Sequence, residues 1–177
     1  MTGCVALRSE SEWFYSQLTR SLEEVTEQLS WAQIPLAPNA YLHTNGTIIG
    51  IVQHIAVGKF MYGSTAFRGT EIRWRDCIGR LEAIGTSWEG TIAYLSEAQA
   101  YWLSTWPDLT DADLESEYLH FRGVKWPAWK IISMINHHDA YHGGQIGLLS
   151  SVLTPSPTPP DLCLDEERKA VFDLPGW

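Results

Sequence analysis

Hydrophobic residues recur along this chain at the spacings of three and four that are typical of amphipathic helices. In residues 9–30, apolar side chains at positions 14, 18, 22, 25 and 29 are separated by acidic and polar ones, which predicts a first helix with one buried stripe. Residues 47–62 are nearly all apolar, so a second helix should be buried on most of its sides. The stretch "TSWE", residues 86–89, has the capping-box arrangement and predicts another long helix that ends before Pro107.

Residues 107–177 are predicted to contain one more helix and two irregular segments. A short extended or hairpin segment is predicted around residues 117–125, with Gly123 at its bend. Pro127 suits the first position of a helix, and the pattern predicts that this helix runs to about Leu153. Four long helices with irregular connections predict an all-α four-helix bundle, residues 1–153. The prolines that follow exclude helix and central strand, so residues 154–177 should form a proline-rich and acidic C-terminal tail.

Composition narrows the class of protein. A chain of 177 residues suits one domain. Its 12 basic against 21 acidic residues give a net charge of −9, which argues against a protein that binds nucleic-acid phosphates or an anionic membrane surface. The three cysteines have no CxxC spacing, the N-terminus lacks a basic signal-peptide region, and no apolar segment reaches bilayer length. We therefore predict a cytoplasmic protein with no nucleic-acid and no membrane partner.

Three of the six histidines lie in "INHHDAYHGGQIG", residues 135–147. On a helix, residues four apart share a face, whereas direct neighbours diverge by about 100°. His138 and His142 therefore form a pair on the buried stripe, and His137 belongs to a different, solvated face. His43 and His120 carry no signal of a ligand role, although His43 lies close to the start of the second helix.

Two imidazoles on a buried stripe need a partner, because an unpaired ring nitrogen is costly there and a protonated ring more so. A divalent metal such as Zn, Ni or Fe would satisfy both. His54, in the middle of the apolar second helix, is the predicted third ligand. Three imidazoles leave coordination positions open, as in catalytic sites. Gln145 and Asp139 are candidates to orient a ligand imidazole or a bound water, and Gln145 is favoured because it continues the same stripe.

The two histidine-containing stretches also resemble a known family. "GIVQHIA" and "NHHDAYHGGQIGLL" are similar to the DinB-like family, in which a histidine of the second helix and an H-x-x-x-H-x-G-Q/E-I run of the fourth bind one divalent metal. The matching positions are His54, His138 and His142, followed by residues 144–146. The resemblance covers residues 9–153 and implies a four-helix bundle, frequently a homodimer. It also implies a metal-dependent transferase or isomerase that uses a low-molecular-weight thiol and acts on a small-molecule substrate.

Two other functions are compatible with the same residues. "HDAYH" resembles the zinc-protease motif H-E-x-x-H with aspartate in place of glutamate, so Asp139 would be the general base of a zinc hydrolase. Its third ligand would be Glu166 or Glu167, and we rank this interpretation lower because aspartate reaches less far and a proline-rich linker positions a ligand poorly. The third interpretation is a non-enzymatic metal-binding or stress-related bundle.

Overall fold

The computed structural model describes residues 2–34, 46–120 and 123–160. Within these ranges the chain is mostly helical, which confirms the predicted all-α class. The elements in chain order are α1 (Gly3–Arg20), α2 (Glu27–Trp31), α3 (Ile48–Phe67), α4 (Trp74–Ile84), α5 (Trp88–Thr105), the 3-10 turn η1 (Asp113–Glu115), β1 (Glu117–Leu119), β2 (Lys125–Pro127) and α6 (Ala128–Val152). None of the helices in the described ranges is long and apolar enough to cross a bilayer.

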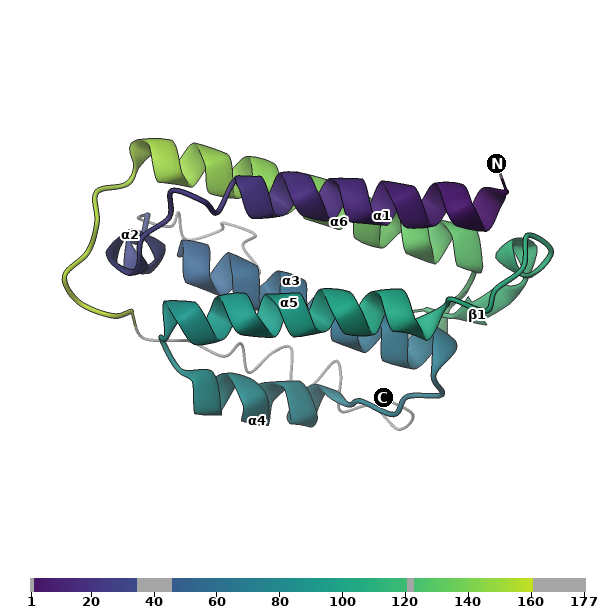
Figure 1. The fold of residues 1–177 in the computed structure, drawn as a ribbon. Coiled ribbons are helices and arrows are strands. Elements are labelled where there is room, and N and C mark those ends of the chain that lie inside the picture. Colours follow the sequence, from purple (N-terminus) through teal and green to yellow (C-terminus); the bar gives the residue numbers. More distant parts are fainter. Residues whose placement is uncertain (1, 35–45, 121–122, 161–177) are drawn as a thin grey trace.

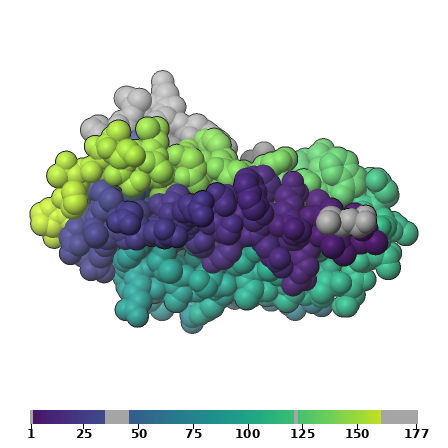
Figure 2. All heavy atoms as spheres, turned by 45° about the horizontal axis from the view of Figure 1, so that its top comes forward, coloured from purple at the N-terminus to yellow at the C-terminus, as the bar shows by residue number. Residues whose placement is uncertain are grey.

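Four long helices form the bundle. α1 packs along α6, α3 packs along α5, and α3 also contacts α6, so the two pairs are joined through α3 and α6. α4 lies outside the second pair, and the hairpin lies at one end of the bundle (Figure 1). In the space-filling view, α1 runs as a purple band across one face, with α6 on one side and the teal part of the chain, which includes α5, on the other (Figure 2).

The first predicted helix is wrong beyond residue 20, because the chain turns there. α1 ends at Arg20, and the Ser21 hydroxyl donates to the Leu18 carbonyl at 2.6 Å, which satisfies one free acceptor of the last turn. Thr26 then starts α2, since its hydroxyl accepts the N–H of Leu29. The apolar stripe continues through both pieces, and periodicity alone cannot reveal such a break.

Hydroxyl caps also set where the next helices begin. Thr47 caps α3 by accepting a first-turn N–H at 3.1 Å, and the helix continues past the predicted end at Tyr62. α5 is capped by Ser87, which accepts the N–H of Gly90 at 3.1 Å. The predicted capping box at Thr86 is therefore one residue too early, because the following serine takes the capping position.

The hairpin before α6 is present as predicted. β1 and β2 pair antiparallel with Tyr118 opposite Trp126. Gly123 has φ of +72°, a conformation that favours glycine. Pro127, the predicted first helical position, ends β2 and is the N-cap of α6, so the helix begins one residue later than predicted. Beyond α6, the Ser156 N–H donates to the Gln28 carbonyl; the division into a bundle of residues 1–153 and a tail of residues 154–177 stays a prediction.

The core consists of two apolar clusters and a set of buried polar side chains. One cluster gathers around Leu18, Ile55 and Ile146, and the other around Trp102 and Ile131. The buried polar residues on α1, α3 and α6 include four that are at most 2% exposed: Ser11, Lys59, Asn136 and Asp139. Buried polar groups are costly without partners, so the contacts of these side chains matter for how the three helices pack.

Candidate metal centre

Three histidine side chains converge between α3 and α6. The i, i+4 spacing of His138 and His142 places both rings on one face of α6, opposite His54 of α3. The Nε2 atom of His138 lies 3.0 Å from that of His54 and 3.2 Å from that of His142. One ligand atom from each ring lies within 4.8 Å of the other two. The structure thus brings together the three predicted ligands, which we call the histidine cluster.

The spacing of these nitrogens is close to that of a metal-bound set. Two nitrogens bound to a tetrahedral zinc ion at about 2.0–2.1 Å lie about 3.3 Å apart. The two short Nε2 to Nε2 distances, 3.0 and 3.2 Å, are slightly below this value. One ion placed among the three rings would therefore require only small side-chain movements.

Burial keeps the histidine cluster neutral. Desolvation, followed by repulsion from His142, lowers the pKa of His54 to about 3. Desolvation, with smaller contributions from the two other rings, also lowers the pKa of His138 well below its usual value. The pKa of His142 is lowered by desolvation too, although the hydrogen bond to Gln145 opposes this effect. At neutral pH all three rings are therefore in the uncharged form that binds metals.

Gln145 orients His142. Its Oε1 atom accepts a hydrogen bond from Nδ1 of His142 at 2.6 Å, and its Nε2 donates to the hydroxyl of Tyr141 at 2.9 Å. Since a carbonyl oxygen only accepts, the ring proton of His142 lies on Nδ1, and Nε2 carries a lone pair directed at the cluster. Metal-binding histidines usually have such an outer partner. Gln145 thus lies next to His142, on the stripe from which the sequence made it a candidate to orient a ligand imidazole.

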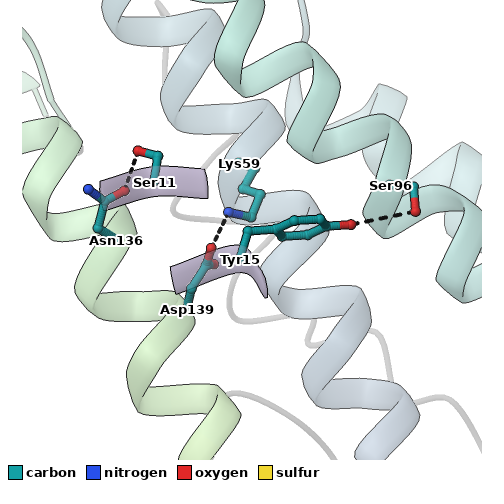
Figure 3. Close-up of polar contacts among 6 residues, drawn as sticks. All are labelled: Ser11, Tyr15, Lys59, Ser96, Asn136 and Asp139. Carbon is teal, nitrogen blue, oxygen red and sulfur yellow. Dashed lines mark hydrogen bonds and ion pairs between the residues drawn. The ribbon is translucent and has the colours of Figure 1, made fainter. Parts of the chain in front are cut away.

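Asp139 contacts a lysine instead of a histidine. Its Oδ2 accepts from Nζ of Lys59 at 2.6 Å, and its Oδ1 has no hydrogen-bond partner among the described residues. Burial raises the pKa of Asp139 and lowers that of Lys59, while the attraction between them opposes both shifts. Figure 3 shows the two side chains pointing at each other across α3 and α6. This contact engages one oxygen, Oδ2, of the carboxylate that the hydrolase interpretation needs as a base.

Lys59 is a site residue that sequence reasoning missed. A signal was present, because Lys59 is the single charged residue between positions 47 and 67, in a helix that is otherwise apolar. A lysine in such a helix is rarely buried without a counter-charge. Its partner Asp139 could not be identified from spacing, since the two lie eighty positions apart.

The other predicted residues lie apart from the histidine cluster. His120 is buried and stacks between two aromatic rings, and His137 is exposed on α6 with its ring edge against Phe14. Neither residue belongs to the histidine cluster. His43, Glu166 and Glu167 lie outside the described residues.

The sequence was then compared with known families. The DinB superfamily profile matches residues 12–146, a range that contains all three residues of the histidine cluster. The chain belongs to the DinB superfamily. No curated protein matches the sequence of this DinB chain significantly.

A solved structure shares the DinB fold of this chain. It is the crystal structure of the colibactin self-resistance protein ClbS in complex with a dsDNA, with a TM-score of 0.61 and 18% sequence identity. The match covers 84% of this chain and 95% of ClbS. At this identity the likeness shows a common fold.

This comparison contradicts the partners predicted from the sequence of the DinB chain. Those partners were a small-molecule substrate and a second copy of the chain, with nucleic acid and membrane excluded, yet a protein of this fold is crystallised with dsDNA. The exclusion failed because net charge is a sum over the whole chain and does not describe one face. Residues 161–177, for example, hold five acidic and two basic residues and so contribute three of the nine net negative charges.

Proposed function

We propose that the histidine cluster binds one divalent metal ion, Zn, Ni or Fe, through the Nε2 atoms of His54, His138 and His142. The observation that carries this proposal is the convergence of three neutral imidazoles, from two helices, within 4.8 Å of one another. Three protein ligands leave at least one coordination position open, which is the arrangement of catalytic sites. Membership in the DinB superfamily supports the same function.

The proposed reaction type is a transfer in which a low-molecular-weight thiol is the cofactor. A divalent ion, when bound, favours the thiolate form of a coordinated thiol at neutral pH. The chain contributes the three neutral rings, the hydrogen bond that His142 donates to Gln145, and the ring of Tyr141, which lies edge-on to His142 and is 63% exposed. Tyr141 therefore lies on the solvent side of the cluster, where a thiol would enter.

The zinc-hydrolase alternative is weaker on the geometry. It requires Asp139 to accept a proton from a metal-bound water. The carboxylate oxygen that lies 2.6 Å from the Lys59 ammonium is stabilised as an acceptor for that ammonium. We therefore favour the thiol-dependent transferase over the hydrolase.

Metal titration of the purified protein tests the site. Metal-free protein is titrated with Co²⁺ and Zn²⁺, and Co²⁺ binding is followed by its visible absorption. We expect one equivalent per chain for the parent and at least about a hundredfold weaker binding for His54→Ala, because one of three ligands is lost. His137→Ala is the matched control, since His137 is an exposed neighbour on α6 and should bind like the parent. Equal binding by parent and His54→Ala would rule out the proposed site.

A thiol assay tests the reaction type. Protein loaded with Zn, Ni or Fe is incubated with monochlorobimane and, in separate arms, glutathione, bacillithiol or mycothiol, and the fluorescent adduct is measured. We expect turnover with one thiol that is lost after chelation and in His138→Ala. Metal binding without turnover in every arm would favour the non-enzymatic bundle and would overturn the transferase.

Duplex DNA is a second candidate partner, and the observation that favours it is the crystallisation of ClbS with dsDNA. Anisotropy of a labelled duplex should detect binding that weakens as salt rises, because phosphate contacts release counterions. A duplex that stays unbound at low salt would remove this candidate and leave the metal site unaffected.

A further inference from the structure

The buried ion pair of Lys59 and Asp139 joins the two helices that carry the histidine cluster. Lys59 lies on α3, little more than one turn after His54, and Asp139 directly follows His138 on α6. Their side chains are 1% and 2% exposed, and the Nζ to Oδ2 distance is 2.6 Å. In contrast, the ion pairs Arg8–Glu12 and Arg80–Glu97 lie on the surface.

Packing alone does not call for this pair. Removing two charges from water carries a penalty that their attraction only partly offsets, and well-packed apolar residues of similar size are often at least as stable. The pair is also incompletely satisfied, because Oδ1 of Asp139 has no hydrogen-bond partner among the described residues. Buried charges that are not needed for stability are best attested where they fix one arrangement of helices over others.

The pair acts at the turn of α3 against which His138 rests. A Cβ atom built on Gly58 would lie 3.6 Å from Cε1 of His138, so the imidazole packs against the α3 backbone directly before Lys59. A slide of α3 along α6 would therefore move His54 and the surface beneath His138 together. Metal sites tolerate deviations of only about 0.2 Å in ligand distance.

We propose that Lys59 and Asp139 are positioning residues of the histidine cluster. Their ion pair fixes the axial register of α3 on α6, so that the Nε2 atom of His54 meets those of His138 and His142. Figure 3 shows Lys59 of α3 and Asp139 of α6 extending toward each other, with Tyr15 of α1 beside them. The effect on metal binding rests on the proposed function, whereas the effect on the register of the two helices applies to the metal-free protein as well.

The test replaces the pair with apolar residues in the double variant Lys59→Met/Asp139→Leu. We expect a melting temperature equal to or above that of the parent, because no buried charge is left unpaired, together with 10- to 100-fold weaker Zn²⁺ binding in competition with a chelator. In the metal-free protein, the NMR cross-peaks between the rings of His54 and His138, whose centroids are 4.9 Å apart, should weaken.

The matched control is Ser11→Ala/Asn136→Leu, which also removes a buried polar contact of α6 but one made with α1, a helix without a ligand. It should keep parent metal affinity within about twofold and the ring cross-peaks. If the apolar double variant does not fold, Asp139→Asn takes its place, since its amide oxygen can still accept from Lys59 while the ion pair is lost. Parent-like cross-peaks and affinity would overturn the positioning role. A parent that binds no Zn²⁺ would instead overturn the proposed function. The cross-peaks between the rings of His54 and His138 in the metal-free protein would then still show whether the ion pair positions the two helices.

Discussion

Two polar groups lie side by side on α6, and they differ in the kind of contact that they make. Asn136 accepts from the hydroxyl of Ser11 at 2.5 Å and donates to Glu10 at 3.0 Å, so both ends of its amide have partners on α1. In the histidine cluster, the Nε2 atoms face each other at 3.0 and 3.2 Å, although neutral rings each have one donor at most. The amide of Asn136 is accounted for by its contacts with α1, whereas three adjoining neutral imidazoles form a set that can also bind one ion.

Helix geometry separates the two groups. Asn136 faces α1, while His138 and His142 are rotated from it by about 160° and about 120° around α6 and face α3. Gly143 lies against Leu18 of α1, which confirms the direction of the first face. The same seven residues of α6 thus supply a structural contact on one side and the candidate metal centre on the other.

Acidification should give the largest effect, a loss of stability that comes from the histidine cluster and not from the contacts of Asn136. Unfolded histidines are protonated below about pH 6.5, whereas the buried rings stay neutral, so the unfolded state binds more protons and stability falls as pH falls. In metal-free protein we expect a loss of up to about 1.4 kcal/mol per ring between pH 6.5 and 5.5, or up to about 4 kcal/mol in all. For His54 the window extends down to about pH 3. Urea unfolding at each pH measures the slope, which should decrease in His54→Leu and remain unchanged in His137→Ala.

Metal saturation should stabilise the protein next most strongly. At a free Zn²⁺ concentration 100 times its Kd, the free energy of unfolding rises by about 2.7 kcal/mol, which corresponds to roughly 5–10 °C in Tm for a chain of this size. Differential scanning calorimetry with and without a chelator measures it. Asn136→Ala should show the same shift, and a shift that disappears in this variant would mean that the two groups are coupled.

Truncation of Asn136 should lower the stability of the protein and leave its metal binding intact. Asn136→Ala leaves the buried Ser11 hydroxyl and Glu10 without their partner, at a cost of about 1–3 kcal/mol. Urea unfolding measures the loss of stability of this variant, and Zn²⁺ titration measures its metal affinity. A loss of metal affinity larger than twofold would contradict the division between the groups.

The smallest expected effect concerns the partner of His142. Gln145→Ala removes the acceptor of the His142 ring proton and should weaken Zn²⁺ binding about tenfold, or about 1.4 kcal/mol. Tyr141→Phe should change the affinity less, because Tyr141 is an exposed residue whose hydroxyl accepts from Gln145 and is one step further from the His142 ring. An effect of Tyr141→Phe equal to that of Gln145→Ala would show that the chain of hydrogen bonds acts as one unit.

Much of the fold was predictable, because apolar spacing reports which face of a helix is buried. The long helices around His54 and His138, the hairpin and its bend at Gly123 all follow from local patterns. The break at Ser21 and the N-cap at Ser87 did not, since several hydroxyl residues compete at each helix end and tertiary packing selects one of them. The partner prediction failed for a different reason: a net charge contains no information about where charges lie.

The sequence by itself determined the pairing of His138 with His142, the separate face of His137 and the place of Gln145 one turn beyond His142, because one helical turn fixes all of these. It also pointed to His54 as an imidazole in an apolar helix. Only the tertiary structure decided that Asp139 faces Lys59, and that the three Nε2 atoms lie close enough to share one ion. Contacts between α3 and α6 join residues about eighty positions apart, and their geometry depends on how the whole bundle packs.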